Sequence, residues 1–106
     1  MVTINDFKKI ELRIAKILEA EEHPNADKLY VLKVDLGDSQ KQLVAGIRGF
    51  YTKEELVGRQ VVVIQNLEPA TIRGVESAGM VLVAQDREGL SLLIPDKEMQ
   101  LGACVR

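Results

Sequence analysis

Short apolar segments alternate with polar residues along this chain, and turn residues separate the segments at intervals of about ten positions. The clearest segment is 29–36, in which every second side chain from Tyr30 to Leu36 is apolar. Gly-Asp-Ser follows at 37–39, and a second extended segment runs from 40 to 47. A period of two predicts a strand with one buried face, and the glycine-containing turn predicts an antiparallel hairpin.

Residues 10–22 also predict a strand, but their apolar period slips in the middle. Apolar residues are two positions apart up to Ile14, whereas Ile17 follows after three. A β-bulge near Ala15–Lys16 would keep the apolar side chains on one face and would bend the strand. A helix is the alternative for this window, because its isoleucines also share one helical face.

Helix signals are confined to two short segments. Residues 3–9 predict a lead-in helix, with apolar side chains three positions apart. Residues 52–56 predict a second helix, which Thr52 caps together with Glu55 three positions later. The apolar or alternating patterns of the remaining chain predict further strands at 61–64, 80–85 and 90–94 and in the tail, 97–106.

This order of elements predicts one all-β domain over residues 1–106. A mostly antiparallel barrel of the OB-fold type fits it best, with five strands in Greek-key order and a short helix between strands three and four. Residues 10–85 would form the barrel and residues 86–106 a C-terminal extension. We find no internal repeat and no low-complexity segment.

The stretch from Asn66 to Met80 lies between two apolar runs that must be buried. Its glycines, its proline and its β-branched residues argue against a helix. The small polar side chains and the single cation of this stretch are Asn66, Thr71, Ser77 and Arg73. Because functional residues gather on loops that a rigid scaffold holds, we predict that this loop forms one lip of a nucleic-acid groove.

The charge balance excludes a general positive field, since 14 cations face 16 anions and the net charge is −2. Nucleic-acid binding would therefore rest on shape and a few placed cations. Aromatic residues are 4% of the chain, and we expect Phe7 and Tyr30 in the core, so stacking on several bases cannot be the main device. The candidate contacts are the polar groups of Asn66 and Ser77, the cations Lys28, Lys33, Arg48 and Arg73, and the thioether of Met80.

Other classes of function lack support in the residues. The single cysteine, Cys104, excludes an internal disulfide and a cysteine-based zinc site, and we expect it to be packed or inert. His23 stands beside Pro24 in a polar turn and is expected at the surface. No phosphate loop or nucleophile elbow is present, so we predict no catalytic residue, metal or cofactor. No apolar run approaches the roughly 20 residues of a membrane span, and no secretion signal is visible, so we expect a cytoplasmic protein.

Several longer motifs occur in a fixed order: D-F-K-K-I-E-L-R-I-A-K-I, H-P-N-A-D-K-L, Y-T-K-E-E-L-V-G-R, V-V-V-I-Q-N-L-E-P and I-R-G-V-E-S-A-G-M-V-L-V-A. Together they closely resemble the tRNA-binding domain at the C-terminus of methionyl-tRNA synthetases. The same domain occurs as free-standing tRNA-binding proteins and in the cytokine-precursor component of the multisynthetase complex. The resemblance implies an OB-fold that binds tRNA by its structure and helps a synthetase catalytic body to hold its substrate.

The resemblance also implies particular contacts and an assembly. It implies tRNA contacts at Asn66, Ser77 and Met80, with Lys28 and Arg73 as supporting cations. It implies a homodimer whose interface includes the extension 86–106. Relatives often carry lysine where this chain has Glu68 and a basic residue near Thr71, and the loss of cations at the lip of a groove should weaken binding.

Three hypotheses follow. The first is a non-catalytic tRNA-binding module that supports aminoacylation. The second is a dimerisation or protein-interaction module with weak or no RNA binding, which the acidic balance and Glu68 favour. The third is a barrel that binds oligosaccharides or other small ligands, which the fold type allows but the scarcity of aromatic residues disfavours.

Overall fold

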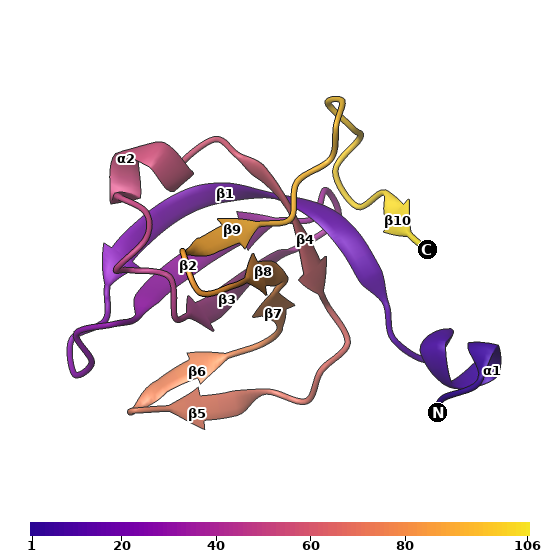
Figure 1. Ribbon diagram of the computed structural model, residues 1–106, viewed down its shortest axis with the longest axis horizontal. Coiled ribbons are helices and arrows are strands. Elements are labelled where there is room, and N and C mark those ends of the chain that lie inside the picture. The colour runs from indigo at the N-terminus through magenta and orange to yellow at the C-terminus, as the bar shows by residue number, and fades with distance from the viewer.

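The computed structural model describes all residues from 1 to 106 as a small β-barrel with two helices of one turn each (Figure 1). The helices are α1 (Ile4–Phe7) and α2 (Lys53–Leu56), and neither has the length or apolar character to span a bilayer. The strands are β1 (Leu12–Glu22), β2 (Tyr30–Asp35), β3 (Gln40–Ala45), β4 (Gln60–Ile64), β5 (Ala70–Ile72), β6 (Val75–Ser77), β7 (Met80–Val81), β8 (Val83–Gln85), β9 (Leu90–Leu92) and β10 (Cys104–Val105).

Five antiparallel strands form the nearly closed barrel, in the order β3-β2-β1-β4-β7. The predicted hairpin of β2 and β3 is confirmed, with Tyr30 opposite Ala45 and Asp35 opposite Gln40. The helix between the third and fourth strands is confirmed too, and Thr52 and Glu55 form the expected capping box. The all-β barrel predicted from the sequence is therefore the observed fold.

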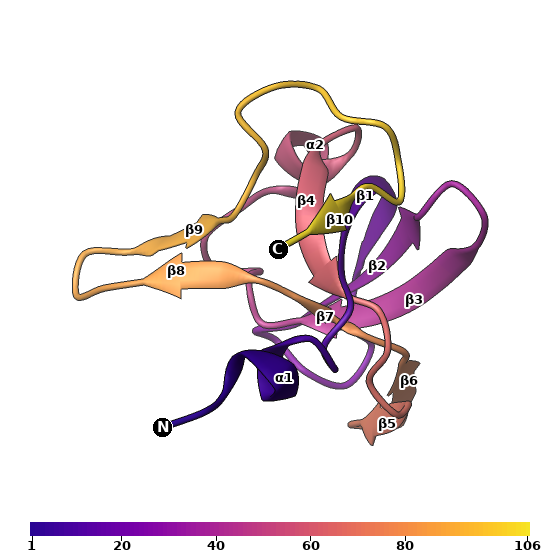
Figure 2. The same cartoon turned by 90° about the vertical axis from the view of Figure 1, so that its right-hand side faces the viewer.

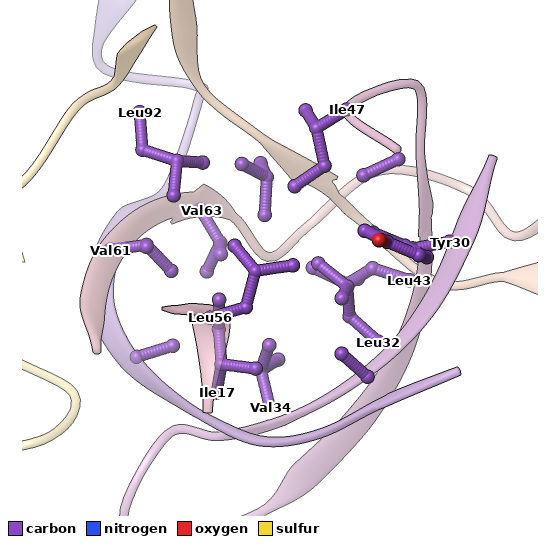
Figure 3. Close-up of a cluster of buried hydrophobic side chains, with 14 of the residues drawn as sticks. Ile17, Tyr30, Leu32, Val34, Leu43, Ile47, Leu56, Val61, Val63 and Leu92 are labelled. Atoms are coloured by element: carbon purple, nitrogen blue, oxygen red, sulfur yellow. The ribbon is translucent and has the colours of Figure 1, made fainter. Parts of the chain in front are cut away.

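The barrel encloses a core built from all five of its strands, with further side chains from α2 and β9 (Figure 3). Leu56, from α2, lies among the side chains of the surrounding strands, next to Ile17 and the valines of β4. It is fully buried, and its helix covers one end of the barrel. Burial of a leucine of this kind stabilises the fold by roughly 1.5–3 kcal/mol, which explains why a helix of one turn persists here.

The long curved strand β1 corrects our prediction for residues 10–22 (Figure 1). Its pairing with β4 runs without interruption from Leu12 to Lys16, so no bulge lies at Ala15–Lys16. The bulge lies between Ile17 and Glu19, in the pairing with β2. Up to Ile14 the apolar period follows the outer face of the strand, and from Ala15 on it follows the inner face. The apolar period slips because side chains on both faces of the strand are covered by other parts of the fold. The alternative that residues 10–22 form a helix is excluded.

The chain beyond β7 forms less regular structure than we predicted. The expected strand 80–85 divides at Leu82 into β7, which pairs with β4, and β8, which pairs with β9. The hairpin of β8 and β9 projects from the barrel (Figure 2). The last residues then turn back, so that β10 pairs with the start of β1 and Ile14 donates its N–H to Ala103 at 2.9 Å.

Two side chains lie in different environments from those we predicted. Cys104 is exposed, because β10 lies at the edge of the sheet and its outward face is uncovered. Phe7 is 38% exposed, because α1 stands beside the barrel and buries no side chain. Tyr30, in contrast, is in the core as expected.

Candidate nucleic-acid interface

The stretch from Asn66 to Met80 is a β-hairpin rather than a loop. Strands β5 and β6 pair with Ile72 opposite Val75, and Arg73 and Gly74 form the two-residue turn. Both turn residues have positive φ, 52° and 90°, as a type I′ hairpin turn requires. The sequence feature that indicates this hairpin is Gly74 in an Arg-Gly pair between two β-branched residues, and our prediction of a loop overlooked it.

A buried histidine fastens this hairpin to the loop between β1 and β2. His23 is only 4% exposed, so our surface prediction for it was wrong. Its Nε2 lies 2.9 Å from the carbonyl oxygen of Ile72, and its Nδ1 lies 2.9 Å from the N–H of Asn25. Because Nδ1 accepts the hydrogen bond from Asn25, Nε2 is the nitrogen that carries the hydrogen in the neutral ring, and it donates to the carbonyl of Ile72.

The two turns are joined a second time at their tips. The Asn25 amide donates to the carbonyl of Arg73 at 3.2 Å, and the Arg73 guanidinium donates to the carbonyl of Asn25 at 3.0 Å. Four hydrogen bonds thus join the hairpin, the β1–β2 loop and His23 into one wall. The H-P-N segment at 23–25 and the I-R-G segment at 72–74, which are far apart in the sequence, are thus in contact.

A groove of about 520 Å³ runs beneath this wall, across the outer faces of β2 and β3. Pro24 of the β1–β2 loop and Val75 of the hairpin form its rim. Its charged lining has both signs: Glu19, Glu21, Glu22, Lys33 and Lys41. A groove of this composition cannot attract a polyanion by field alone, so a ligand would be held by shape and by individual cations.

Of the four predicted cations only Lys33 lines the groove, and the four differ in availability. Lys33 lines the groove and makes no ion pair, and Lys28 is exposed in the β1–β2 loop. Arg48 forms an ion pair with Glu22, so a ligand would have to compete for it. Arg73 uses one nitrogen on Asn25, and the rest of its exposed guanidinium faces solvent.

The three predicted motif residues have different positions. Asn66 holds the N-terminal segment: its carbonyl accepts from the N–H of Glu11 at 2.9 Å, and its amide donates to the carbonyl of Lys9 at 2.7 Å. Met80 is 46% exposed beside an apolar hollow at the end of β3. Asn66 therefore acts first as a clamp within the chain, while Met80 can pack against a ligand.

Ser77 is not on the surface. It is 5% exposed; its hydroxyl accepts from the N–H of Val44 at 3.0 Å and donates to the carbonyl of Gly79 at 3.1 Å. Ser77 thus helps to close the barrel, and its direct contact with RNA stays a prediction. Nothing in the local sequence around Ser77 indicated this structural role, because its partner Val44 is 33 positions away.

The barrel closes where the chain near Ser77 meets β3. The N–H of Ala78 donates to Gln42 at 2.8 Å, and the amide of Gln42 donates to Glu76 at 2.8 Å. Gly79 allows the chain to lie close to both neighbouring strands: a Cβ there would lie 2.9 Å from Cδ2 of Leu43 in β3 and 2.7 Å from the carbonyl oxygen of Ile64 in β4. The E-S-A-G-M segment is thus the seam of the barrel, and it also holds Gln42, which lines the groove.

The fold and the groove define a class of protein. A small antiparallel barrel with a groove across its second and third strands, bordered by two connecting loops, belongs with the barrels that bind oligonucleotides or oligosaccharides. Comparison with known proteins narrows this class. The family model described as a putative tRNA binding domain matches residues 12–104, and the chain belongs to this family.

Relatives and solved structures agree with this assignment. The chain is 57% identical to a methionine–tRNA ligase of Thermococcus kodakarensis over 105 residues, which are 99% of this chain and 14% of the ligase. It is 52% identical to the ligase of Thermotoga maritima over 98% of this chain and 16% of that protein. The chain thus spans about a seventh of the length of these curated relatives.

Two solved structures have the same fold over the whole chain. A protein from Pyrococcus horikoshii described as related to MetRS is 31% identical, with a TM-score of 0.93 and coverage of 100% of this chain and 98% of that one. The chaperone CsaA of Bacillus anthracis is also 31% identical, with a TM-score of 0.90 and coverage of 100% and 99%.

Proposed function

We propose that this chain is a non-catalytic module that binds tRNA by its structure and so supports aminoacylation by a methionine–tRNA ligase. It would act as part of such a ligase or as a separate chain beside the catalytic body. The observation that carries the proposal is the family match over almost the entire barrel, which includes both turns of the wall above the groove. On this proposal the protein works in the cytoplasm, where tRNA is charged.

Lys33 would contact phosphates inside the groove, with Lys28, Arg48 and Arg73 at its borders. Met80 would add an apolar contact at the end of β3. The side chain of Asn66 is hydrogen-bonded to the backbone of Lys9 and Glu11, so it would contact RNA only through its remaining donor and acceptor positions. The three glutamates of the groove limit the affinity. Recognition would therefore follow the shape of folded tRNA rather than its sequence, and it would weaken as salt rises.

We further propose that two copies associate through the extension 86–106. Exposed apolar side chains of this extension support the proposal: Leu93, Ile94 and Met99. Exposed apolar side chains that lie together suit a protein interface. Light scattering at tens of micromolar should give twice the monomer mass of 11.8 kDa, and the monomer mass would contradict the dimer.

Fluorescence anisotropy with labelled tRNA tests the main proposal. The protein should bind folded tRNA with a dissociation constant in the micromolar range at moderate salt, and it should bind an unrelated RNA hairpin of similar charge at least several-fold more weakly. Equal affinity for both RNAs would contradict structure-specific recognition. A ligase from which this module is deleted should show a raised KM for tRNA with little change in kcat, because the module adds binding rather than chemistry.

A protein-interaction module with little RNA binding is the second candidate. The glutamates in the groove and the exposed Glu68 beyond β4 favour it. It predicts the dimer without a salt-dependent affinity for any RNA, so the two measurements above separate the candidates.

A further inference from the structure

Phe50 is an exposed aromatic ring on a rigid segment. It is 47% exposed in the connection between β3 and α2. The N–H groups of Phe50 and Tyr51 both donate to the carbonyl of the buried Ile47, at 2.9 and 3.2 Å. The hydroxyl of Tyr30 donates to the carbonyl of Tyr51 at 2.8 Å. The backbone is thus held on both sides of a phenylalanine whose ring the fold leaves in solvent.

The other aromatic side chains are committed elsewhere. Tyr30 is in the core. The hydroxyl of Tyr51 accepts from the N–H of Leu92 at 3.0 Å, and Arg59 lies over its ring at 5.6 Å. Phe7 stands on α1, outside the barrel. Phe50 is therefore the aromatic surface that the barrel offers to a ligand near the groove.

A hollow of about 390 Å³ lies beside this ring, and Arg48 and Lys53 line it. Both cations are paired with one carboxylate, that of Glu22: Arg48 contacts one oxygen, and Lys53 lies 3.5 Å from the other. Glu22 also lines the main groove. The ion pairs of Glu22 thus connect the groove, which Glu22 lines, with the hollow, which Arg48 and Lys53 line.

We propose that Phe50, Arg48 and Lys53 form a subsite for one unpaired nucleotide of the bound RNA. Its base stacks on Phe50, and its phosphate takes the place of the Glu22 carboxylate between the two cations. Phosphate and carboxylate use the same charge-assisted hydrogen bonds from arginine and lysine, so Glu22 occupies the subsite until RNA displaces it. The inference rests on the proposed RNA binding and names one place where an unpaired base enters.

A tryptophan at position 50 reports on the subsite directly, because the chain has none of its own. Phe50→Trp fluorescence should be quenched when a single-stranded RNA hexamer or tRNA is added. Phe7→Trp is the matched control, since Phe7 is also an exposed phenylalanine but lines neither the groove nor the hollow. Its fluorescence should stay constant. Unchanged Phe50→Trp fluorescence at saturating RNA would overturn the subsite.

Two further variants separate stacking from packing and charge. Phe50→Leu keeps an apolar side chain but removes the π face, and it should weaken tRNA binding about 5- to 50-fold, since base stacking carries most of such a contact. Glu22→Gln frees both cations and should strengthen binding several-fold with a steeper salt dependence. Wild-type affinity in Phe50→Leu would overturn the proposal. If the native chain discriminates no tRNA but the hexamer still quenches Phe50→Trp, the structure-specific function fails while the subsite stands.

Discussion

The substitution Ser77→Ala tests whether the hydroxyl of Ser77 stabilises the barrel or contacts RNA directly. In Ser77→Ala the N–H of Val44 loses its hydrogen-bond acceptor in a residue that is itself buried, and the carbonyl of Gly79 loses a donor. A buried polar group left without a partner costs about 1–3 kcal/mol. The Gly79 carbonyl is half-buried and can turn to water, so the Val44 N–H dominates the cost.

The expected loss is therefore about 1–3 kcal/mol of unfolding free energy. For a domain of this size each kcal/mol lowers the melting temperature by roughly 4 °C, so the midpoint should fall by roughly 4–12 °C. Far-UV circular dichroism against temperature, with urea titration at 25 °C, measures both quantities. Below its own midpoint the folded variant should bind tRNA within about threefold of the native affinity.

Ser91→Ala is the control for this experiment. Ser91 is exposed on β9, and its hydroxyl donates only to the neighbouring carbonyl of Leu92. Its loss should change stability by no more than about 0.5 kcal/mol. Our reasoning is refuted if Ser77→Ala melts like the native protein and yet binds tRNA more than tenfold more weakly, because the hydroxyl would then act on RNA.

Three other changes test the seam, the groove and a helix cap. Gly79→Ala should cost about 1–3 kcal/mol in a denaturant titration, because its Cβ would lie 2.7 Å from a backbone oxygen that cannot move aside; Gly89→Ala, with open space around it, should be close to neutral. Lys33→Gln should lower the slope of log K against log salt by roughly 0.7–0.9, whereas Lys97→Gln should leave that slope unchanged. Hydrogen bonds from the backbone N–H and hydroxyl of its cap threonine hold the pKa of Glu55 below its usual value. Its contribution to stability is then present above the ordinary pKa of glutamate and is lost as pH falls through the lowered pKa, so Glu55→Gln should flatten the acid-side decline of the melting temperature.

The local patterns of the chain were enough to predict the architecture. The alternation from Tyr30 to Leu36, the capping box at Thr52 and the turn residues between them each describe interactions among neighbours in sequence. Such interactions determine whether a segment is a strand, a turn or a helix. Their order then determines the barrel, because few arrangements of short antiparallel strands bury every apolar face.

The tertiary structure alone decided which polar residues are exposed. His23 is buried because a hairpin 49 positions later places the carbonyl of Ile72 on its ring. Ser77 is buried because the barrel closes between it and Val44. A polar side chain can be buried without a large energetic cost only where a hydrogen-bond partner replaces water. When that partner is distant in the sequence, the residue type and its neighbours do not predict the burial. The sequence therefore identified the segments that form the candidate site. Only the tertiary structure showed which of their residues face the groove and which are buried and hold the barrel and the hairpin in place.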